Sequence, residues 1–272
     1  MKKNYKHLIR RIRDLKNAFP HFQVQIPGHL TYSGEEFPFF ALSITRDKAP
    51  YQGNKKNICI SAGIHGDEPA GVEALFAIIE SGGFLDGYLQ SFDFMIFPCV
   101  NPAGYENDKR ETPDGIDLNR QFKLPAPPQE VTYIKKMTQE VPFSLHIDFH
   151  EDIDASGFYL YEVVQAAGLP FGEKIIDAVS GKYPINLQEK IEGRMAINGI
   201  IRREEQNLSS GFHEILESNL YWPMVFYFYS KGTSHAFTFE TPVHLQMTER
   251  IEIHKTAFST ALESLDPIRV FP

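Results

Sequence analysis

The chain has 272 residues, of which 42% are hydrophobic and 13% aromatic, enough for a sizeable buried core. Its formal net charge of -8 argues against the basic surface of a nucleic-acid-binding protein. No apolar run has the form of a signal peptide or approaches the roughly 20 residues of a transmembrane helix. With only Cys59 and Cys99, a disulfide framework is not expected. We therefore expect a cytoplasmic protein with neither membrane nor nucleic-acid partners; the sequence leaves its oligomeric state open.

The N-terminal region predicts a helix followed by two strands. The helix is basic and carries an apolar stripe, typical of a surface helix packed on the protein body; contact with a membrane or polyanion is the alternative. Residues 22–28 and 37–45 are expected to be strands joined by a turn at 33–34. Because no linker or repeat divides the chain, we expect one domain over residues 1–272, with residues 1–50 packed on its body. The apolar stripe of the predicted N-terminal helix comprises Tyr5, Leu8, Ile9, Ile12 and Leu15.

The rest of the chain alternates apolar strands with helices. This alternation predicts an α/β sheet covered on both faces, in which ligands bind beyond the carboxyl ends of the strands. The polar segment 101–128 is expected to be a functional loop, whereas residues 185–220 have no clear pattern. The predicted strands lie at 57–62, 92–100, 143–150, 157–164 and 235–240. The predicted helices lie at 67–81, where Gly82-Gly83 is expected to stop the helix, and at 128–139, 170–181, 222–231 and 247–264.

Polar side chains at the ends of two predicted strands suggest a metal site. His65 and Glu68 lie three residues apart, where a strand turns into a helix, and His150 ends a strand that carries His146 and Asp148 on the same face. Burying three polar groups on one face is costly without partners. Two histidines and a carboxylate form a known catalytic zinc arrangement. Alternatively, Glu68 complements the helix dipole, and His150 is an ordinary hydrogen-bonded histidine.

Further charged residues could complete such a site. Glu240 ends a late apolar strand and could act as a general base, although a solvated strand-end glutamate is the alternative. Arg110 could stabilise an oxyanion, and Arg120 with Asn119 could bind a carboxylate, unless the arginines form surface salt bridges. Asp117 could accept the second ring proton of His65.

These residues, in this order and spacing, resemble the zinc carboxypeptidase family and, more broadly, the carboxypeptidase and aspartoacylase/succinylglutamate desuccinylase superfamily. The resemblance covers residues 57 to about 242 and implies a mixed, mostly eight-stranded sheet between helices. The motifs that carry it are His65-Gly66-Asp67-Glu68, Asn101-Pro102-Ala103-Gly104-Tyr105, Arg110, Asp117-Leu118-Asn119-Arg120, His150 and Thr238-Phe239-Glu240.

The resemblance also implies roles for individual residues. One zinc ion would be held by His65, Glu68 and His150. Arg110 would stabilise the oxyanion and Glu240 would be the general base. The terminal carboxylate of the substrate would be bound by Asn119 and Arg120, and Tyr221 is the candidate for the tyrosine that carboxypeptidases often carry on a mobile loop.

We therefore expect a hydrolase that cleaves an amide bond next to a free carboxylate in a small peptide or peptide-like substrate. An N-acyl amino-acid deacylase of the desuccinylase or aspartoacylase kind is the alternative, with an acyl-amino-acid substrate. A metal-binding protein without turnover is a third reading, which the complete set of ligands, base and arginines argues against. The sequence does not identify the residue that recognises the substrate side chain.

Overall fold

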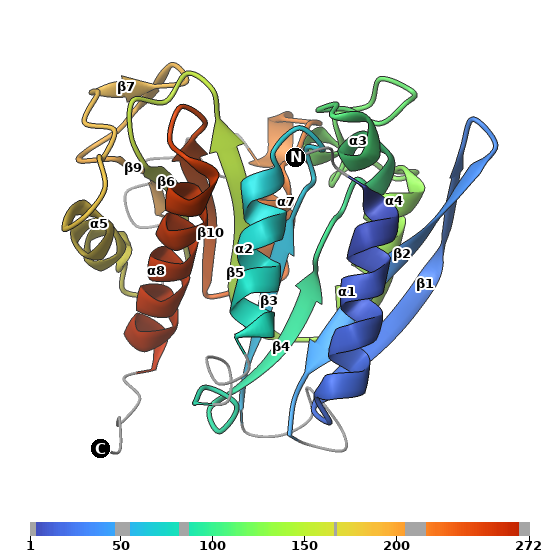
Figure 1. Cartoon of the computed structure of the whole chain (residues 1–272). Helices are drawn as coiled ribbons and strands as arrows, with labels where there is room; N and C mark the ends of the chain where they lie inside the picture. The colour runs from blue at the N-terminus through green and yellow to red at the C-terminus, as the bar shows by residue number, and fades with distance from the viewer. Residues whose placement is uncertain (1–3, 47–54, 82–86, 166–167, 205–215, 267–272) are drawn as a thin grey trace.

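The centre of the fold is a mixed eight-stranded sheet in the order β1-β2-β4-β3-β5-β10-β6-β9 (Figure 1). It is seen in a computed structural model that describes residues 4–46, 55–81, 87–165, 168–204 and 216–266. The sheet confirms the predicted fold class. Its strands are β1 (Phe22–Tyr32), β2 (Glu35–Ile44), β3 (Lys56–Ala62), β4 (Phe92–Phe97), β5 (Phe143–Asp152), β6 (Tyr159–Val164), β9 (Ile200–Glu204) and β10 (His235–Pro242).

The strand directions bring the polar strand ends to one edge of the sheet. β4, β3, β5 and β10 are neighbours and run parallel, so their carboxyl ends lie together. β2 and β6 pair antiparallel with the outer members of this group. In the β5–β10 register Glu240 is the partner of His150, which places both side chains on the same face of the sheet.

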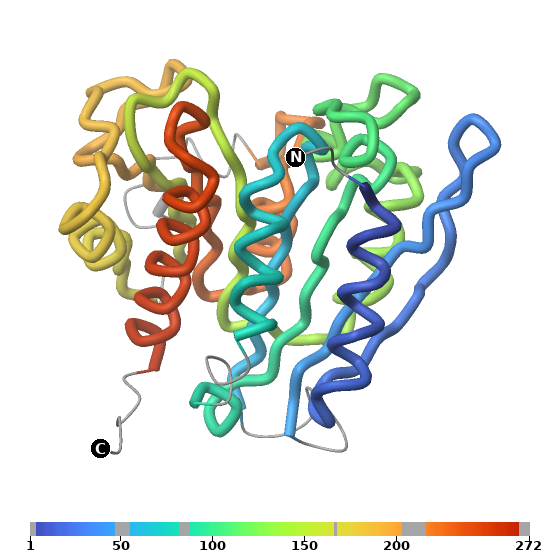
Figure 2. Tube along the Cα trace, in the orientation of Figure 1, coloured from blue at the N-terminus to red at the C-terminus, as the bar shows by residue number. Residues whose placement is uncertain are grey.

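Helices cover both faces of the sheet, as the tube in Figure 2 also shows. One face carries α1 (Tyr5–Ala18), α2 (Pro69–Glu80), α5 (Gly172–Ser180) and α8 (Met247–Leu265). The opposite face carries α4 (Gln129–Thr138) and α7 (Met224–Ser230), while α3 (Pro102–Asn107) follows β4 at the carboxyl edge. Within the described ranges, none of the helices combines the length and apolarity that a bilayer crossing requires.

The N-terminal helix packs as its apolar stripe predicts. Tyr5, Leu8, Ile12 and Leu15 are buried, and Ile9 is partly buried against the core. Arg11 fastens α1 to α2, because its guanidinium donates to Glu73 and Glu80 at 2.7 Å. The predicted turn after β1 is also present, with positive φ angles at Ser33 (51°) and Gly34 (81°).

The structure contains several short elements that the sequence did not predict. Residues 185–220, which show no sequence pattern, contain β9 and a small antiparallel pair, β7 (Lys190–Ile191) and β8 (Arg194–Met195). The polar segment 101–128 contains α3 and the 3-10 turn η1 (Leu118–Arg120). Elements of two or three residues are too short for a hydrophobic period to develop, so the sequence gives no signal for them. The predicted helix stop at 82–83 lies outside the described residues.

Candidate active site

The segment between β3 and α2 is shaped so that His65 and Glu68 face the same space. Gly63 has a φ of 62°, and a Cβ on Gly66 would lie 2.0 Å from the backbone of Gly104, so the loop packs directly on α3. Glu68 is the N-cap residue of α2, and Pro69 occupies the first helical turn. These constraints hold both side chains at the carboxyl edge of the sheet.

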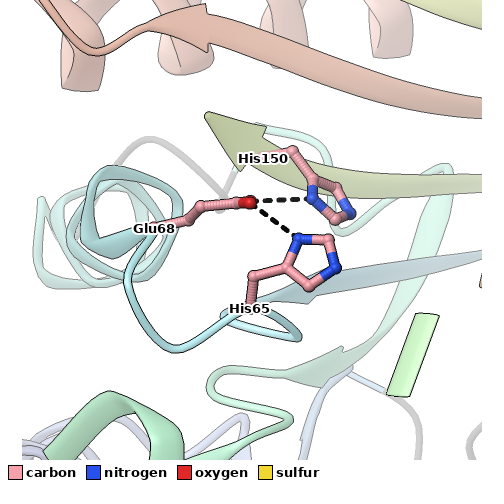
Figure 3. A group of neighbouring side chains, drawn as sticks. All are labelled: His65, Glu68 and His150. Carbon is pink, nitrogen blue, oxygen red and sulfur yellow. Dashed lines mark hydrogen bonds and ion pairs between the residues drawn. The ribbon is translucent and has the colours of Figure 1, made fainter. Parts of the chain in front are cut away.

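His65, Glu68 and His150 converge at this edge (Figure 3). The Nδ1 atom of His65 lies 2.6 Å from Glu68 Oε1, and the Nδ1 atom of His150 lies 2.8 Å from Glu68 Oε2. One ligand atom from each side chain can be chosen so that all lie within 4.8 Å of one another, and all three residues are buried. The structure therefore brings together side chains from two segments that are 82 residues apart.

The surroundings of these side chains fit a divalent cation. The Nε2 atom of His65 lies 3.2 Å from Asp117 Oδ1, and the Nε2 atom of His150 lies 2.9 Å from Asp148 Oδ2. An imidazole that binds a metal through one nitrogen commonly donates its other ring proton to a carboxylate. Each Nδ1 atom is then free to face the ion beside the Glu68 carboxylate. The donor set is the one found in catalytic zinc sites.

The charges at this site are strongly coupled. Burial would raise the pKa of Glu68, but the neighbouring His65 and His150 outweigh it and lower the pKa. Burial would likewise lower the pKa of His150, but Asp148 and Glu68 outweigh it and raise the pKa well above its usual value. Carboxylates therefore surround the two imidazoles, and a bound cation would offset their negative charge.

The remaining polar residues on this face of β5 have supporting positions. Asp148 accepts a hydrogen bond from Ser61 Oγ at 2.7 Å, which fixes the carboxylate that faces His150. His146 stacks on Phe228 with ring centroids 3.9 Å apart, away from the converging side chains. Burial lowers the pKa of His146 to about 4. His146 is thus a packed, neutral side chain beneath the site.

A cavity of about 910 Å³ opens beside the converging side chains. Glu240 lines it next to His150 and is buried. Burial raises the pKa of Glu240 well above its usual value, against the opposing effect of His150. A carboxylate in such surroundings holds a proton more readily than one in water. Its position beside the metal-type site suits proton transfer.

Four residues of the polar segment 101–128 line the cavity: Asp108, Arg110, Asn119 and Arg120. Arg110 donates to Glu68 Oε1 at 3.1 Å and to Asp117 Oδ2 at 3.4 Å. Asn119 accepts from the backbone N–H of Met224 at 2.8 Å, which ties η1 to the start of α7. The exposed Arg120 donates to the carbonyl of Asn119 at 2.9 Å.

Tyr221 and further residues, most of which the sequence did not single out, also line the cavity. Tyr221 is 61% exposed and stands at the rim, just before α7. The cavity is also lined by Tyr161, Val163, Glu192, Arg194, Val225, Phe226 and Thr238. Thr238 on β10 pairs with Asp148 on β5 and with Tyr161 on β6, and paired side chains lie on the same face of a sheet. The alternation along these strands could therefore have placed Tyr161 and Thr238 on the face that carries His150. No motif signals the short β7–β8 hairpin.

Comparison with known proteins agrees with this architecture. Residues 54–248 match the succinylglutamate desuccinylase/aspartoacylase catalytic domain. The chain therefore belongs to the succinylglutamate desuccinylase/aspartoacylase family. Its sequence is also 29% identical over 126 residues to a probable carboxypeptidase 2 of Trichophyton verrucosum, covering 43% of this chain and 24% of that protein. The chain thus spans about a quarter of the length of this relative.

Solved structures show the same fold. A protein of Shewanella amazonensis that is provisionally named a metallopeptidase has a TM-score of 0.74 and 20% identity, covering 97% of this chain and 92% of that one. A metallo-carboxypeptidase of Burkholderia cenocepacia has a TM-score of 0.64 and 16% identity, covering 96% of this chain and 69% of that one. At these identities the likeness establishes the fold.

Proposed function

We propose that the protein is a zinc-dependent hydrolase that cleaves an amide bond next to a free carboxylate in a peptide or peptide-like substrate. The observation that carries this proposal is the convergence of the His65, Glu68 and His150 donor atoms beside a cavity lined by Glu240. The family membership and the fold of metallo-carboxypeptidases support it.

The proposed roles follow from where the side chains lie. A zinc ion, when bound by His65, Glu68 and His150, supplies Lewis acidity for the attack of water on the scissile carbonyl. Glu240 accepts a proton from the attacking water and delivers it to the leaving amine nitrogen. Arg110, beside Glu68, donates to the oxyanion that forms at the carbonyl.

Substrate positioning falls to the η1 segment. The guanidinium of Arg120 can bind a carboxylate through two parallel hydrogen bonds, and the side-chain amide of Asn119 can donate a further one. The backbone of this segment is fixed, because Asp117 accepts from the N–H of Asn119 at 2.9 Å. Tyr221, at the rim, is positioned to cover a bound substrate.

A second candidate function is hydrolysis of an N-acyl amino acid. The match to the desuccinylase/aspartoacylase catalytic domain favours it specifically. The same ligands, base and arginines would act, and the substrate would be smaller. Hydrolysis rates on dipeptides, muropeptides and N-acyl amino acids, each with and without a chelator, would distinguish the two functions.

The decisive variant for the mechanism is Glu240→Gln. It keeps the size of the side chain but removes the proton acceptor, so we expect kcat to fall by roughly 10²–10⁴-fold while zinc content is unchanged. Zinc content is measured by elemental analysis of the same preparation. Glu189→Gln, at an exposed position, is the control and should keep full turnover. Full turnover in Glu240→Gln would remove this residue from the mechanism.

A further inference from the structure

A column of polar side chains continues from the candidate metal site into the core. In the register of the sheet, Ser61 on β3 is the partner of Asp148 on β5, and Cys59 is the partner of His146 one row deeper. Paired residues share a face, and so do residues two apart on a strand, so His146, Asp148 and His150 stand one behind the other. Ser61 and His146 are fully buried, where polar groups are costly without partners.

The contacts in this column form a continuous chain. The Nε2 atom of His146 lies 3.2 Å from Ser61 Oγ, and Ser61 Oγ donates to Asp148 Oδ1 at 2.7 Å. The second oxygen of the same carboxylate, Asp148 Oδ2, lies 2.9 Å from the Nε2 atom of His150. Each oxygen of the carboxylate therefore has its own partner, one on the core side and one on the side of the metal ligand.

The chemistry of these groups fixes where the protons lie. A carboxylate can only accept, and a serine hydroxyl has a single proton to give. The hydrogen bond to the charged oxygen is the stronger one, so Ser61 donates to Asp148 and must accept from His146. His146 therefore carries its proton on Nε2. The opposite tautomer would place an N–H at Nδ1, which is buried and has no hydrogen-bond partner among the described residues.

His146 is held in the state that this chain requires. Its ring stacks on Phe228 of α7, with 3.9 Å between the ring centroids and 12° between the planes, so the ring is fixed in its orientation. Burial lowers the pKa of His146 to about 4, so the imidazole is neutral at neutral pH and has one proton to donate. Hydrogen bonds in series polarise one another, so this deep donor strengthens the bond from Ser61 to Asp148.

We propose that Ser61 and His146 are positioning residues that act on the metal site through Asp148. His146 fixes the hydroxyl of Ser61, and this hydroxyl fixes the carboxylate. The carboxylate in turn keeps the Nδ1 atom of His150 directed toward the ion. The inference rests on the proposed function, because this orientation matters where His150 is a metal ligand.

Heteronuclear NMR of the histidine rings in the metal-free full chain tests the proton direction independently of zinc. Spectra that correlate ring nitrogens with ring protons should show His146 with a protonated Nε2 and a bare Nδ1 at neutral pH. The signals are assigned by their loss in His146→Gln. A proton on Nδ1, or a doubly protonated ring, would overturn the proposal.

Competition with a zinc chelator tests the effect on the metal site. We expect Ser61→Ala to lower zinc affinity by roughly three- to tenfold. His146→Met should lower it as well, whereas His146→Gln, which has the same length and keeps an N–H donor, should retain most of it. Ser180→Ala, at an exposed position of α5, is the control and should bind zinc as the wild type does. Wild-type affinity in Ser61→Ala, or equal losses in the two His146 variants, would overturn the proposal.

A double-mutant cycle distinguishes positioning from a general loss of packing. If the hydroxyl acts through Asp148, Ser61→Ala should change zinc affinity by less than about twofold when it is introduced into Asp148→Ala. An undiminished loss in that background would overturn the proposal. Far-ultraviolet circular dichroism checks that each variant is folded.

Hydrolysis is measured separately on the same variants. The expected zinc affinities, without hydrolysis of any amide by the wild type, would refute the proposed hydrolase and leave the positioning chain standing. Hydrolysis by the wild type, with wild-type zinc affinity in Ser61→Ala, would instead refute the positioning chain and leave the proposed function standing.

Discussion

The two walls of the cavity are built in opposite ways. On the metal-side wall, His65, Glu68 and His150 are buried, and both imidazoles contact further carboxylates. On the hairpin wall, Arg194 is exposed and rests on Tyr161. Groups that must hold a fixed geometry for chemistry gain from a buried, fully partnered network, whereas a group that exchanges ligands must stay accessible. We expect substitutions on the metal-side wall to affect stability and metal binding, and those on the hairpin wall to change stability little.

The largest effect on stability is expected at Arg250. Its guanidinium contacts Glu151, whose other oxygen accepts from the N–H of Ala70 at 2.6 Å, so the pair joins α8, β5 and α2 next to the metal-type site. Arg250→Met would leave a buried carboxylate without its counter-charge, which costs about 3–5 kcal/mol. Urea denaturation of the wild type and the variant measures this cost. Lys255→Met, which removes an exposed pair with Glu252, should change the free energy of unfolding by less than about 1 kcal/mol.

A smaller effect, on zinc affinity, is expected at Asp148. Asp148→Asn would present an amide donor where His150 Nε2 now meets a carboxylate, and would disturb the orientation of the ring. We expect zinc affinity to fall by roughly 10–100-fold, with the far-ultraviolet circular dichroism unchanged. A competition assay with a zinc chelator measures the affinity. Asp154→Asn, an exposed residue that lines the same cavity, is the control; equal affinities for the two variants would argue against a supporting role for Asp148.

The smallest effect on stability is expected at Glu192 on the hairpin wall. Glu192→Gln keeps an acceptor for the hydroxyl of Tyr161, so the free energy of unfolding should change by less than about 1 kcal/mol. Thermal denaturation provides the measurement. A loss of unfolding free energy as large as that of Arg250→Met would show that the hairpin wall contributes as much to stability as the metal-side wall. It would contradict the expected difference between the two walls.

The two walls also differ in how far the sequence predicts them. His65 and Glu68 follow one apolar strand, and His150 and Glu240 end two others, so a parallel sheet is expected to gather them at one edge. The alternation of strands and helices likewise predicts the layered fold, because burial on both faces leaves long apolar runs.

Other features depend on contacts that no local pattern encodes. The β7–β8 strands have only two residues each, too few for alternation to appear, so the placement of Arg194 over Tyr161 emerges only in the fold. The Glu151–Arg250 contact joins residues 99 positions apart. β1 is also longer than predicted, since it continues past Gly28 to Tyr32 beyond a register shift between Gln25 and Gly28.

The proposed zinc ligands His65, Glu68 and His150 are tested by zinc titration of the metal-free full chain. We expect one zinc ion bound per chain in the wild type, loss of tight binding in His65→Ala and in His150→Ala, and unchanged binding in His7→Ala, an exposed histidine on α1. Wild-type protein that binds no zinc, or a His150→Ala variant that binds it as tightly as the wild type, would rule out a zinc site at these three side chains.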